Sequence, residues 1–167
     1  MSRVVIYCDT GGRNVCLYDT HIDKILFARM GKSAKFVGEF RGLMFAIKYI
    51  QMTYKDRDIV LVTDGKTESD VLNGNSNNHR NPTKDYSMLV VLQLEKARLN
   101  NIINVLWLPR GKNHAGIFLQ KLCSKRIKSR QLNGKKIFNI HQFDEVSFVD
   151  NQIKIGVDVP QFLMKDY

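Results

Sequence analysis

The first apolar run of the chain is Val4-Val5-Ile6-Tyr7-Cys8-Asp9-Thr10-Gly11-Gly12, which ends at an acidic residue and a glycine pair. Its β-branched and aromatic side chains predict a buried strand over Val4–Cys8, and Gly11-Gly12 predicts a turn after it. Two further strand-like runs follow, at Asn14–Asp19 and Lys24–Met30, with polar residues between them. We therefore expect the fold to start with a meander of three strands.

A helical pattern follows the meander. Apolar residues between Ser33 and Tyr54 recur at helical spacing, and Glu39 lies four residues before Leu43 on the same apolar stripe. A carboxylate on the core-facing side of a helix is costly unless it is paired or binds a cation. Glu39 is therefore a candidate ligand, and capping or a salt bridge near the helix start is the alternative role.

The rest of the predicted core alternates strands and helices. The unbroken apolar run Ile59–Thr63 predicts a central strand that ends at Asp64-Gly65, and Ile103–Leu108 predicts the last core strand. Helices are expected at Thr67–Leu72, from Asn81-Pro82 onward, and from Asn113 to Arg130. The order β-β-β-α-β-α-α-β-α predicts an α/β domain with a mixed sheet flanked by helices.

The last part of the chain predicts further strands. Strand-like runs occur at Lys136–Ile140, Glu145–Val149 and Gln152–Val157, and Asp150-Asn151 is a candidate hairpin turn. We therefore expect one domain over residues 1–130 and a β-rich C-terminal extension over residues 131–167 that packs on the same domain.

Composition limits the class of protein. With 167 residues, of which 44% are hydrophobic, the chain suits one globular core and excludes a disordered or fibrous protein. Its three cysteines, Cys8, Cys16 and Cys123, include no CxxC pair and are expected to be reduced. The first apolar run is too short for a signal peptide or a membrane span, so we expect an intracellular, cytoplasmic protein without a membrane partner.

Positive charge is concentrated in one segment. The chain carries 26 Lys and Arg against 16 Asp and Glu, a formal net charge of +10. Nine basic residues and no acidic residue lie between Pro109 and Lys136, among them Arg110, Lys112, Lys121, Lys125 and Lys128. Such a segment is a candidate phosphate-contacting surface, and a solvated helix face is the alternative.

Three acidic residues are candidates for a metal site. If the strands that end at Asp9 and Asp64 are parallel neighbours, both carboxylates emerge at the edge where α/β sheets bind ligands. Glu39 reaches that edge from its helix. Three converging carboxylates repel one another unless a divalent cation lies among them, and all-oxygen ligation suits Mg²⁺ or Mn²⁺. Any one of these acids taken alone could be an ordinary turn or cap residue.

Four motifs, in order along the chain, resemble the ribonuclease H (RNase H) family. They are Ile6-Tyr7-Cys8-Asp9-Thr10-Gly11-Gly12, Gly38-Glu39-Phe40-Arg41-Gly42-Leu43, Leu61-Val62-Thr63-Asp64-Gly65 and Trp107-Leu108-Pro109-Arg110-Gly111-Lys112-Asn113-His114-Ala115-Gly116. The resemblance spans Val4 to Arg130. It implies an RNase H-like mixed five-stranded sheet flanked by helices, in agreement with the order of elements above.

The resemblance also implies an activity, namely metal-dependent hydrolysis of the RNA strand of RNA–DNA hybrids. In that family two Mg²⁺ ions flank the scissile phosphate. Asp9 would contact both ions, Glu39 and Asp64 would complete the site, and His114 would assist proton transfer or product release. No small-molecule cofactor is implied. The expected contacts with the hybrid, or with another nucleic acid, are Gly11, Gly12, Arg110, Lys112, Asn113, Lys121, Lys125 and Lys128.

The chain departs from the family at one position. The family has a fourth carboxylate, an Asp, in the first turns of the last helix, where alignment on Asn113 places Ile117 and alignment on Ala115 places Gly116. Either a second ion is weakly held by fewer ligands, or His114 replaces the Asp and favours Mn²⁺, or cleavage is weak or absent. The alternatives to an RNase H are therefore a catalytically weakened or inactive nucleic-acid-binding protein and a superfamily nuclease with another nucleic-acid substrate.

Overall fold

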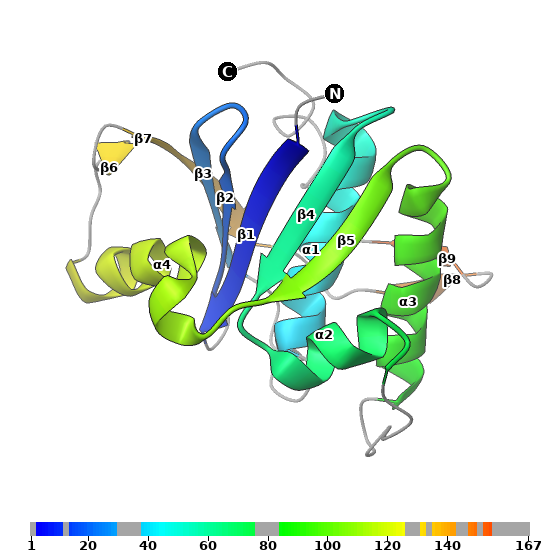
Figure 1. Cartoon of the computed structure of the whole chain (residues 1–167). Helices are drawn as coiled ribbons and strands as arrows, with labels where there is room; N and C mark the ends of the chain where they lie inside the picture. Colours follow the sequence, from blue (N-terminus) through cyan, green and yellow to red (C-terminus); the bar gives the residue numbers. More distant parts are fainter. Residues whose placement is uncertain are drawn as a thin grey trace.

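The computed structural model describes residues 3–11, 14–29, 38–75, 84–125, 131–132, 135–142, 147–149 and 152–154 (Figure 1). Its elements, in chain order, are β1 (Arg3–Gly11), β2 (Asn14–Asp19), β3 (Lys24–Arg29), α1 (Gly38–Thr53), β4 (Asp58–Thr63), α2 (Lys66–Leu72), α3 (Lys84–Arg98), β5 (Ile102–Trp107), the short 3-10 helix η2 (Arg110–Lys112), α4 (His114–Lys125), β6 (Gln131–Leu132), β7 (Lys135–Gln142), β8 (Ser147–Val149) and β9 (Gln152–Lys154).

A mixed seven-stranded sheet forms the centre of the fold, in the strand order β5-β4-β1-β2-β3-β7-β6. The strands β1, β2 and β3 form the expected antiparallel meander, while β4 pairs with β1 and β5 pairs with β4 in parallel. The α/β class and the five core strands expected from the sequence are thereby confirmed. Because β1, β4 and β5 run in one direction, their carboxyl ends meet at one edge of the sheet.

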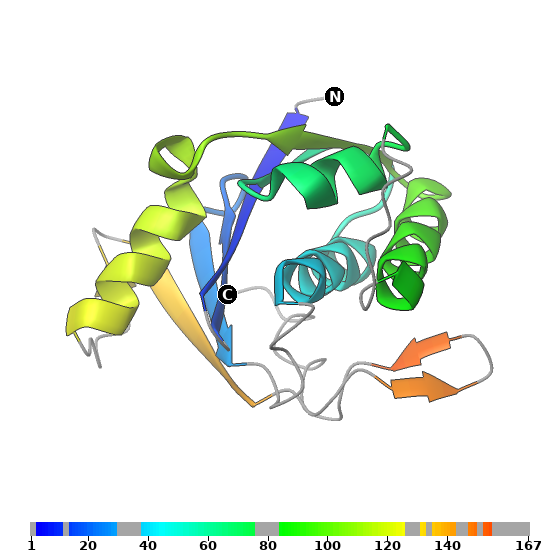
Figure 2. The same ribbon diagram turned by 90° about the horizontal axis from the view of Figure 1, so that it is seen from below.

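Helices cover both faces of this sheet (Figure 2). The helices α1 and α3 pack on one face, where Val4, Ile6 and Cys8 of β1 join the main hydrophobic core. The helix α4 lies on the opposite face and contributes to a smaller cluster formed by Cys16, Tyr18, Ile25, Ala115, Phe118 and Leu119. Since strand residues alternate between the two faces, Tyr7 of β1 packs against this second cluster.

A glycine allows α1 to lie close to β1. A Cβ atom on Gly42 would overlap Cγ2 of Thr10 and would lie 3.5 Å from Sγ of Cys8. The absence of a side chain at this position therefore lets the helix backbone rest on the strand. Glu39 lies one turn earlier in the same helix, so this contact also fixes how near Glu39 comes to Asp9.

Asp19, at the end of β2, is a fully buried carboxylate with three donors. The hydroxyls of Tyr49 and Tyr54 donate to its Oδ2, and the backbone N–H of His21 donates to its Oδ1 at 3.0 Å. Burial, together with the carboxylate, raises the pKa of both tyrosine hydroxyls, so they remain protonated donors. This network ties the C-terminal end of α1 to the β2–β3 turn, as a satisfied buried charge can.

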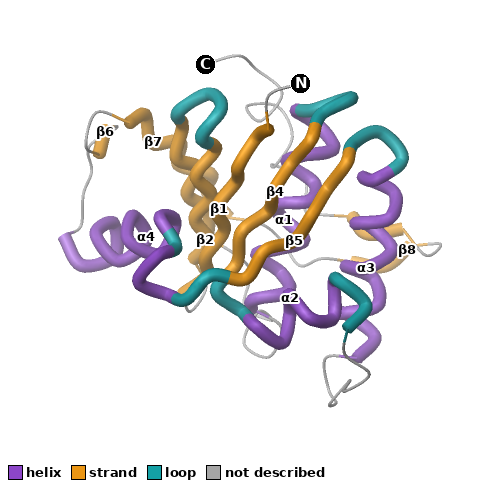
Figure 3. Tube along the Cα trace, in the orientation of Figure 1, coloured by secondary structure: helices purple, strands orange, loops and turns teal. Residues whose placement is uncertain are grey.

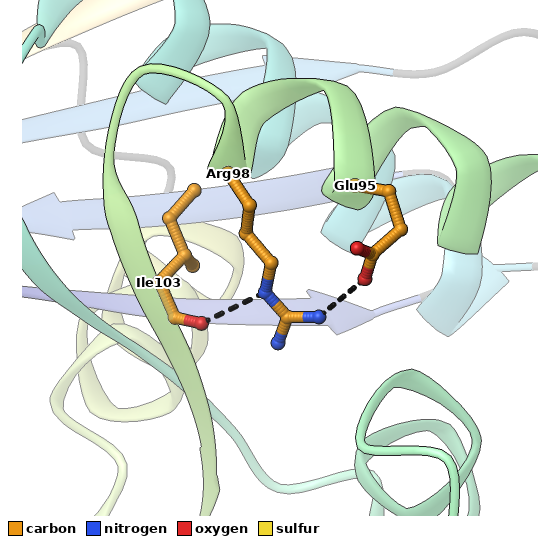
Figure 4. A network of polar contacts seen from close by, with 3 residues as sticks. All are labelled: Glu95, Arg98 and Ile103. Atoms are coloured by element: carbon orange, nitrogen blue, oxygen red, sulfur yellow. Dashed lines mark hydrogen bonds and ion pairs between the residues drawn. The ribbon is translucent and has the colours of Figure 1, made fainter.

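Side chains at the ends of helices fix β4 and β5 as neighbours. Arg98 of α3 donates from Nε to the carbonyl oxygen of Ile103 at 3.0 Å, and its Nη1 pairs with Glu95 at 2.6 Å (Figure 4). The side chain of Asn101 accepts from the backbone N–H of Arg57 at 3.0 Å and donates to the carbonyl oxygen of Tyr54 at 3.0 Å. The starts of both strands are therefore held in register.

The C-terminal part of the described chain adds strands to this core. The strand β7, close to the predicted Lys136–Ile140, pairs in parallel with β3, and the short β6, which the sequence pattern did not indicate, pairs with β7. The strands β8 and β9 form a separate antiparallel pair within the predicted runs Glu145–Val149 and Gln152–Val157, whose remaining residues are not described. The predicted turn Asp150-Asn151, the helix start Asn81-Pro82 and residues 30–37 lie outside the described residues.

Replacing Gly42 with alanine is expected to destabilise the protein by about 1 kcal/mol or more, although alanine favours a helix over glycine by about 1 kcal/mol. The added methyl group would overlap Cγ2 of Thr10, and a close-packed core yields little space. Urea unfolding followed by circular dichroism measures the change.

The matched control is Thr10→Ser, which removes the overlapping methyl group and keeps the hydroxyl. The double variant Thr10→Ser/Gly42→Ala should recover most of the stability lost in Gly42→Ala. If the two single effects simply add in the double variant, the proposed contact between these two positions is wrong.

Candidate metal centre

The carboxylates of Asp9, Glu39 and Asp64 meet at one edge of the sheet. Each offers one oxygen as a ligand, and these three oxygens all lie within 4.8 Å of one another. Asp9 lies near the end of β1, Glu39 lies in the first turn of α1, and Asp64 directly follows β4. Figure 3 shows β1, β4 and β5 ending at the same lower edge of the sheet. The structure thus brings together the three acids that the sequence singled out.

Asp9 is the most constrained of the three. Its side chain is only 6% exposed. Burial raises the pKa of Asp9 to about 7, and repulsion from Asp64 and Glu39 acts in the same direction, while a hydrogen bond from the backbone N–H of Thr10 lowers it. The carboxyl group of Asp64 lies close enough to Asp9 to raise its pKa.

Glu39 is also hard to ionise in this setting. Burial raises its pKa to about 7 in spite of a hydrogen bond with the hydroxyl of Thr10, which lowers the pKa. The charges of Asp64 and Glu68 raise it further, and Arg110 lowers it. The cation that faces Glu39 from η2 therefore does not offset burial and repulsion.

This donor set fits a divalent metal ion. Three carboxylates supply the hard oxygen ligands that Mg²⁺ and Mn²⁺ prefer. A cation among them would offset the repulsion that helps to raise the pKa values of Asp9 and Glu39. The group of Asp9, Glu39 and Asp64 is the one such cluster found among the described residues, and His114 is not a member of it.

The turn that carries Asp64 is held from two sides. The backbone N–H of Gly65 donates to Oγ1 of Thr63 at 3.1 Å, and the indole Nε1 of Trp107 donates to the carbonyl oxygen of Asp64 at 3.1 Å. Sequence reasoning missed Thr10, Thr63 and Trp107, although all three adjoin or lie within the quoted motifs. Their roles depend on contacts between elements, which the pattern of one element does not contain.

Asn113 has a different role from the nucleic-acid contact expected for it. The residue is fully buried. Its Nδ2 donates to the carbonyl oxygen of Cys8 at 2.9 Å, and its Oδ1 accepts from the backbone N–H of Ala115 at 3.1 Å. Asn113 therefore caps α4 and ties it to β1, and we leave it out of the nucleic-acid surface.

The structure decides between the two alignments at the start of α4. A Cβ atom on Gly116 would lie 3.1 Å from Oδ2 of Asp9, whereas the side chain of Ile117 is 40% exposed. Gly116 is therefore the residue of α4 that faces the carboxylates. It stands where the family resemblance implies a fourth carboxylate.

His114 lies at the start of α4, beside aromatic side chains of β1 and β2. It is the first residue of α4, and its ring stacks on that of Tyr7 with 4.6 Å between centroids and 8° between planes. Tyr18 extends the stack on the same face of the sheet. His114 is exposed and contributes no ligand atom to the carboxylate cluster. Its expected part in proton transfer or product release stays a prediction.

The other expected nucleic-acid contacts divide into two groups. Arg110 and Lys112 are exposed in η2, and Gly11 is exposed at the end of β1. Gly12 and Lys128 lie outside the described residues, and the side chains of Lys121 and Lys125 on α4 are not described either. Contacts from this second group stay predictions.

Comparison with known proteins identifies the fold. No protein-family profile and no curated protein matches the chain. Among solved structures, the chain is similar to the N-terminal RNase H domain of a Mycobacterium tuberculosis protein, determined as a fusion with maltose-binding protein. The match has a TM-score of 0.51 at 20% sequence identity and covers 71% of this chain and 95% of that one. The chain therefore has an RNase H-like fold, as the four motifs implied.

The metal-free protein is expected to lose stability as the pH rises from about 4 to about 7. Asp9 and Glu39 ionise near pH 4 in the unfolded chain but with a pKa of about 7 in the folded state. The folded state thus holds protons that the unfolded state has released, and the free energy of unfolding falls across this window, by on the order of 3 kcal/mol. Urea unfolding in EDTA at a series of pH values measures the slope.

Two variants control this pH series. At about pH 8 without metal, Asp9→Asn should be more stable than the wild type, and at about pH 4 the two should be equal. Asp70→Asn, on α2 and outside the cluster, should follow the wild-type curve. Added Mg²⁺ should stabilise the wild type at about pH 8 and leave Asp9→Asn unchanged. A wild-type stability that is flat over this pH range would contradict the proposed crowding of carboxylates.

The substitution Gly116→Asp is expected to strengthen binding of a second divalent ion, because the new carboxylate would lie beside Asp9. The tight space at Gly116, 3.1 Å from Asp9 Oδ2, requires only a small adjustment. Calorimetric titration with Mn²⁺ should show a second ion, or at least about tenfold tighter binding. Ile117→Asp is the matched control, since that side chain points to solvent and should leave Mn²⁺ binding unchanged. Equal effects of both variants would contradict the assignment of Gly116.

Proposed function

We propose that the protein is a metal-dependent endonuclease that hydrolyses the RNA strand of RNA–DNA hybrids. The observation that carries this proposal is the convergence of Asp9, Glu39 and Asp64 at the carboxyl edge of an RNase H-like sheet. The fold supports a nuclease or phosphodiesterase that binds nucleic acid. The substrate is proposed from the resemblance of the four sequence motifs.

The three acids would hold Mg²⁺ or Mn²⁺, with one ion among them and a second held weakly. Asp9 interacts with both other acids and is the proposed shared ligand. When bound, the metal supplies a Lewis acid that polarises the phosphate and lowers the pKa of a coordinated water. The surrounding residues fix the ligands in advance: the hydroxyl of Thr10 holds Glu39, and Trp107 holds the backbone of Asp64.

Arg110 and Lys112 are the proposed contacts for the phosphate backbone. Both are exposed in η2, and Arg110 is near enough to Glu39 to lower its pKa. Cations at this position would attract the phosphates of a hybrid toward the carboxylates. They would also offset the repulsion between those phosphates and the acidic side chains. Lys121, Lys125 and Lys128 are proposed to continue this surface along α4.

A second candidate function is nucleic-acid binding without efficient cleavage. Gly116 favours it, because this residue faces Asp9 and supplies no ligand. The basic segment would serve such a protein equally well. Both candidates have nucleic acid as the partner. No helix in the described part of the chain combines the length and the apolar character that a membrane crossing requires.

Cleavage of a labelled RNA–DNA hybrid in Mg²⁺, and separately in Mn²⁺, tests the proposal. The wild type should cleave the RNA strand, and Asp9→Asn should lower the rate at least about a hundredfold, which corresponds to about 2.7 kcal/mol in the barrier. Asp70→Asn should cleave like the wild type. Duplex DNA and duplex RNA of the same sequence should be poorer substrates.

Binding measured beside cleavage separates the two candidates. Salt-sensitive binding of the hybrid with no cleavage in either metal would overturn the nuclease and favour the binding protein. Arg110→Ala should weaken hybrid binding and reduce the slope of log affinity against log salt concentration by about one unit. An unchanged slope would show that Arg110 contacts no phosphate.

A further inference from the structure

Trp107, the single tryptophan of the chain, adjoins the metal centre. It is the last residue of β5 and pairs with Thr63, the residue before Asp64. Its indole N–H donates to the carbonyl oxygen of Asp64 at 3.1 Å. One edge of the indole is therefore fixed on the backbone of a candidate metal ligand.

The rest of the indole is accessible. Trp107 is 39% exposed, which is high for a side chain that usually buries most of its surface. The Nζ atom of Lys66, an exposed residue at the start of α2, lies 5.1 Å from the centre of the indole ring. An aromatic surface and a cation are thus presented together beside the carboxylates.

Such a pair matches the chemistry of a nucleotide. Aromatic rings pack against bases and sugars without requiring a particular sequence, and a lysine ammonium pairs with a phosphate. Arg110 and Lys112 follow Trp107 closely in the chain and add positive charge in η2. The cation–π contact between Lys66 and Trp107 leaves both side chains exposed at this edge, where a nucleotide can reach them.

We propose that Trp107 and Lys66 together contact the nucleotide next to the phosphate bound at the carboxylates. The ring of Trp107 packs on the sugar and base of that nucleotide, and Lys66 pairs with its phosphate. This inference rests on the proposed function, since it requires nucleic acid at this edge of the sheet. It adds two residues that belong neither to the carboxylate cluster nor to the basic segment.

The intrinsic fluorescence of Trp107 tests the contact directly, because no other tryptophan contributes. The wild type is titrated in EDTA, where cleavage is absent, with an RNA–DNA hybrid and separately with inorganic polyphosphate. The hybrid should change the emission saturably, and polyphosphate should leave it nearly unchanged. An equal change with polyphosphate would overturn the proposal, because it would report charge alone.

Variants separate the contribution of the Trp107 ring from that of the Lys66 ammonium group. Binding is measured by the anisotropy of a labelled hybrid in EDTA. Trp107→Ala should bind about tenfold more weakly with an unchanged salt slope, and Trp107→Phe should stay within about threefold of the wild type because it keeps a ring. Lys66→Gln should reduce the salt slope by about one unit. Leu106→Ala is the matched control, since Leu106 is 45% exposed on the opposite face of β5 and should have no effect.

The outcomes separate this inference from the proposed function. A hybrid that binds without changing the emission, or that binds Trp107→Ala as tightly as Leu106→Ala, overturns the contact alone. Weak binding by Trp107→Phe equal to that of Trp107→Ala also overturns it, because the indole N–H and not the ring would then matter. A hybrid that binds neither in EDTA nor in Mg²⁺ overturns both. If circular dichroism shows that Trp107→Ala is unfolded, the wild-type titration and Trp107→Phe decide.

Discussion

Mutual repulsion among three carboxylates is the main energetic constraint on this fold. Two parallel strands and one helix bring Asp9, Asp64 and Glu39 together, and burial raises the pKa of Asp9 and of Glu39 to about 7. Without a cation the cluster opposes folding at neutral pH. Contacts that stabilise the fold oppose this cost, such as the buried network around Asp19, away from the cluster, and the close packing of α1 at Gly42, beside it.

Much of the scaffold and the identity of the three acids could be predicted from the sequence. Apolar runs that end in an acidic residue place carboxylates at strand ends, and parallel neighbours place those ends together. The features that could not be predicted depend on contacts between distant segments. The side chain of Asn113 donates to the carbonyl oxygen of Cys8. No local sequence pattern indicates this contact, and it buries a residue that was expected on the nucleic-acid surface.

The same limit applies to His114 and to the C-terminal strands. The sequence shows that His114 has the right chemistry for proton transfer, which stays a prediction, but its stacking on Tyr7 depends on the folded sheet. The strand pattern of β7 indicated a strand without indicating its partner β3. Conversely, the structure resolved an ambiguity of alignment, because only the packing of α4 on β1 shows that Gly116 and not Ile117 faces Asp9.

The pairing of β7 with β3 has a consequence for how fast the molecule folds. It joins Lys24 to Lys136, residues more than 100 positions apart, so it closes a long loop and contributes non-local contacts that slow folding. The helix α4 lies between β5 and this strand in the chain and packs on β1 and β2 (Figure 1). Its first turn is held on β1 by Asn113, through a contact that also joins residues more than 100 positions apart. Because both contacts close long loops, the protein is expected to fold slowly for its size.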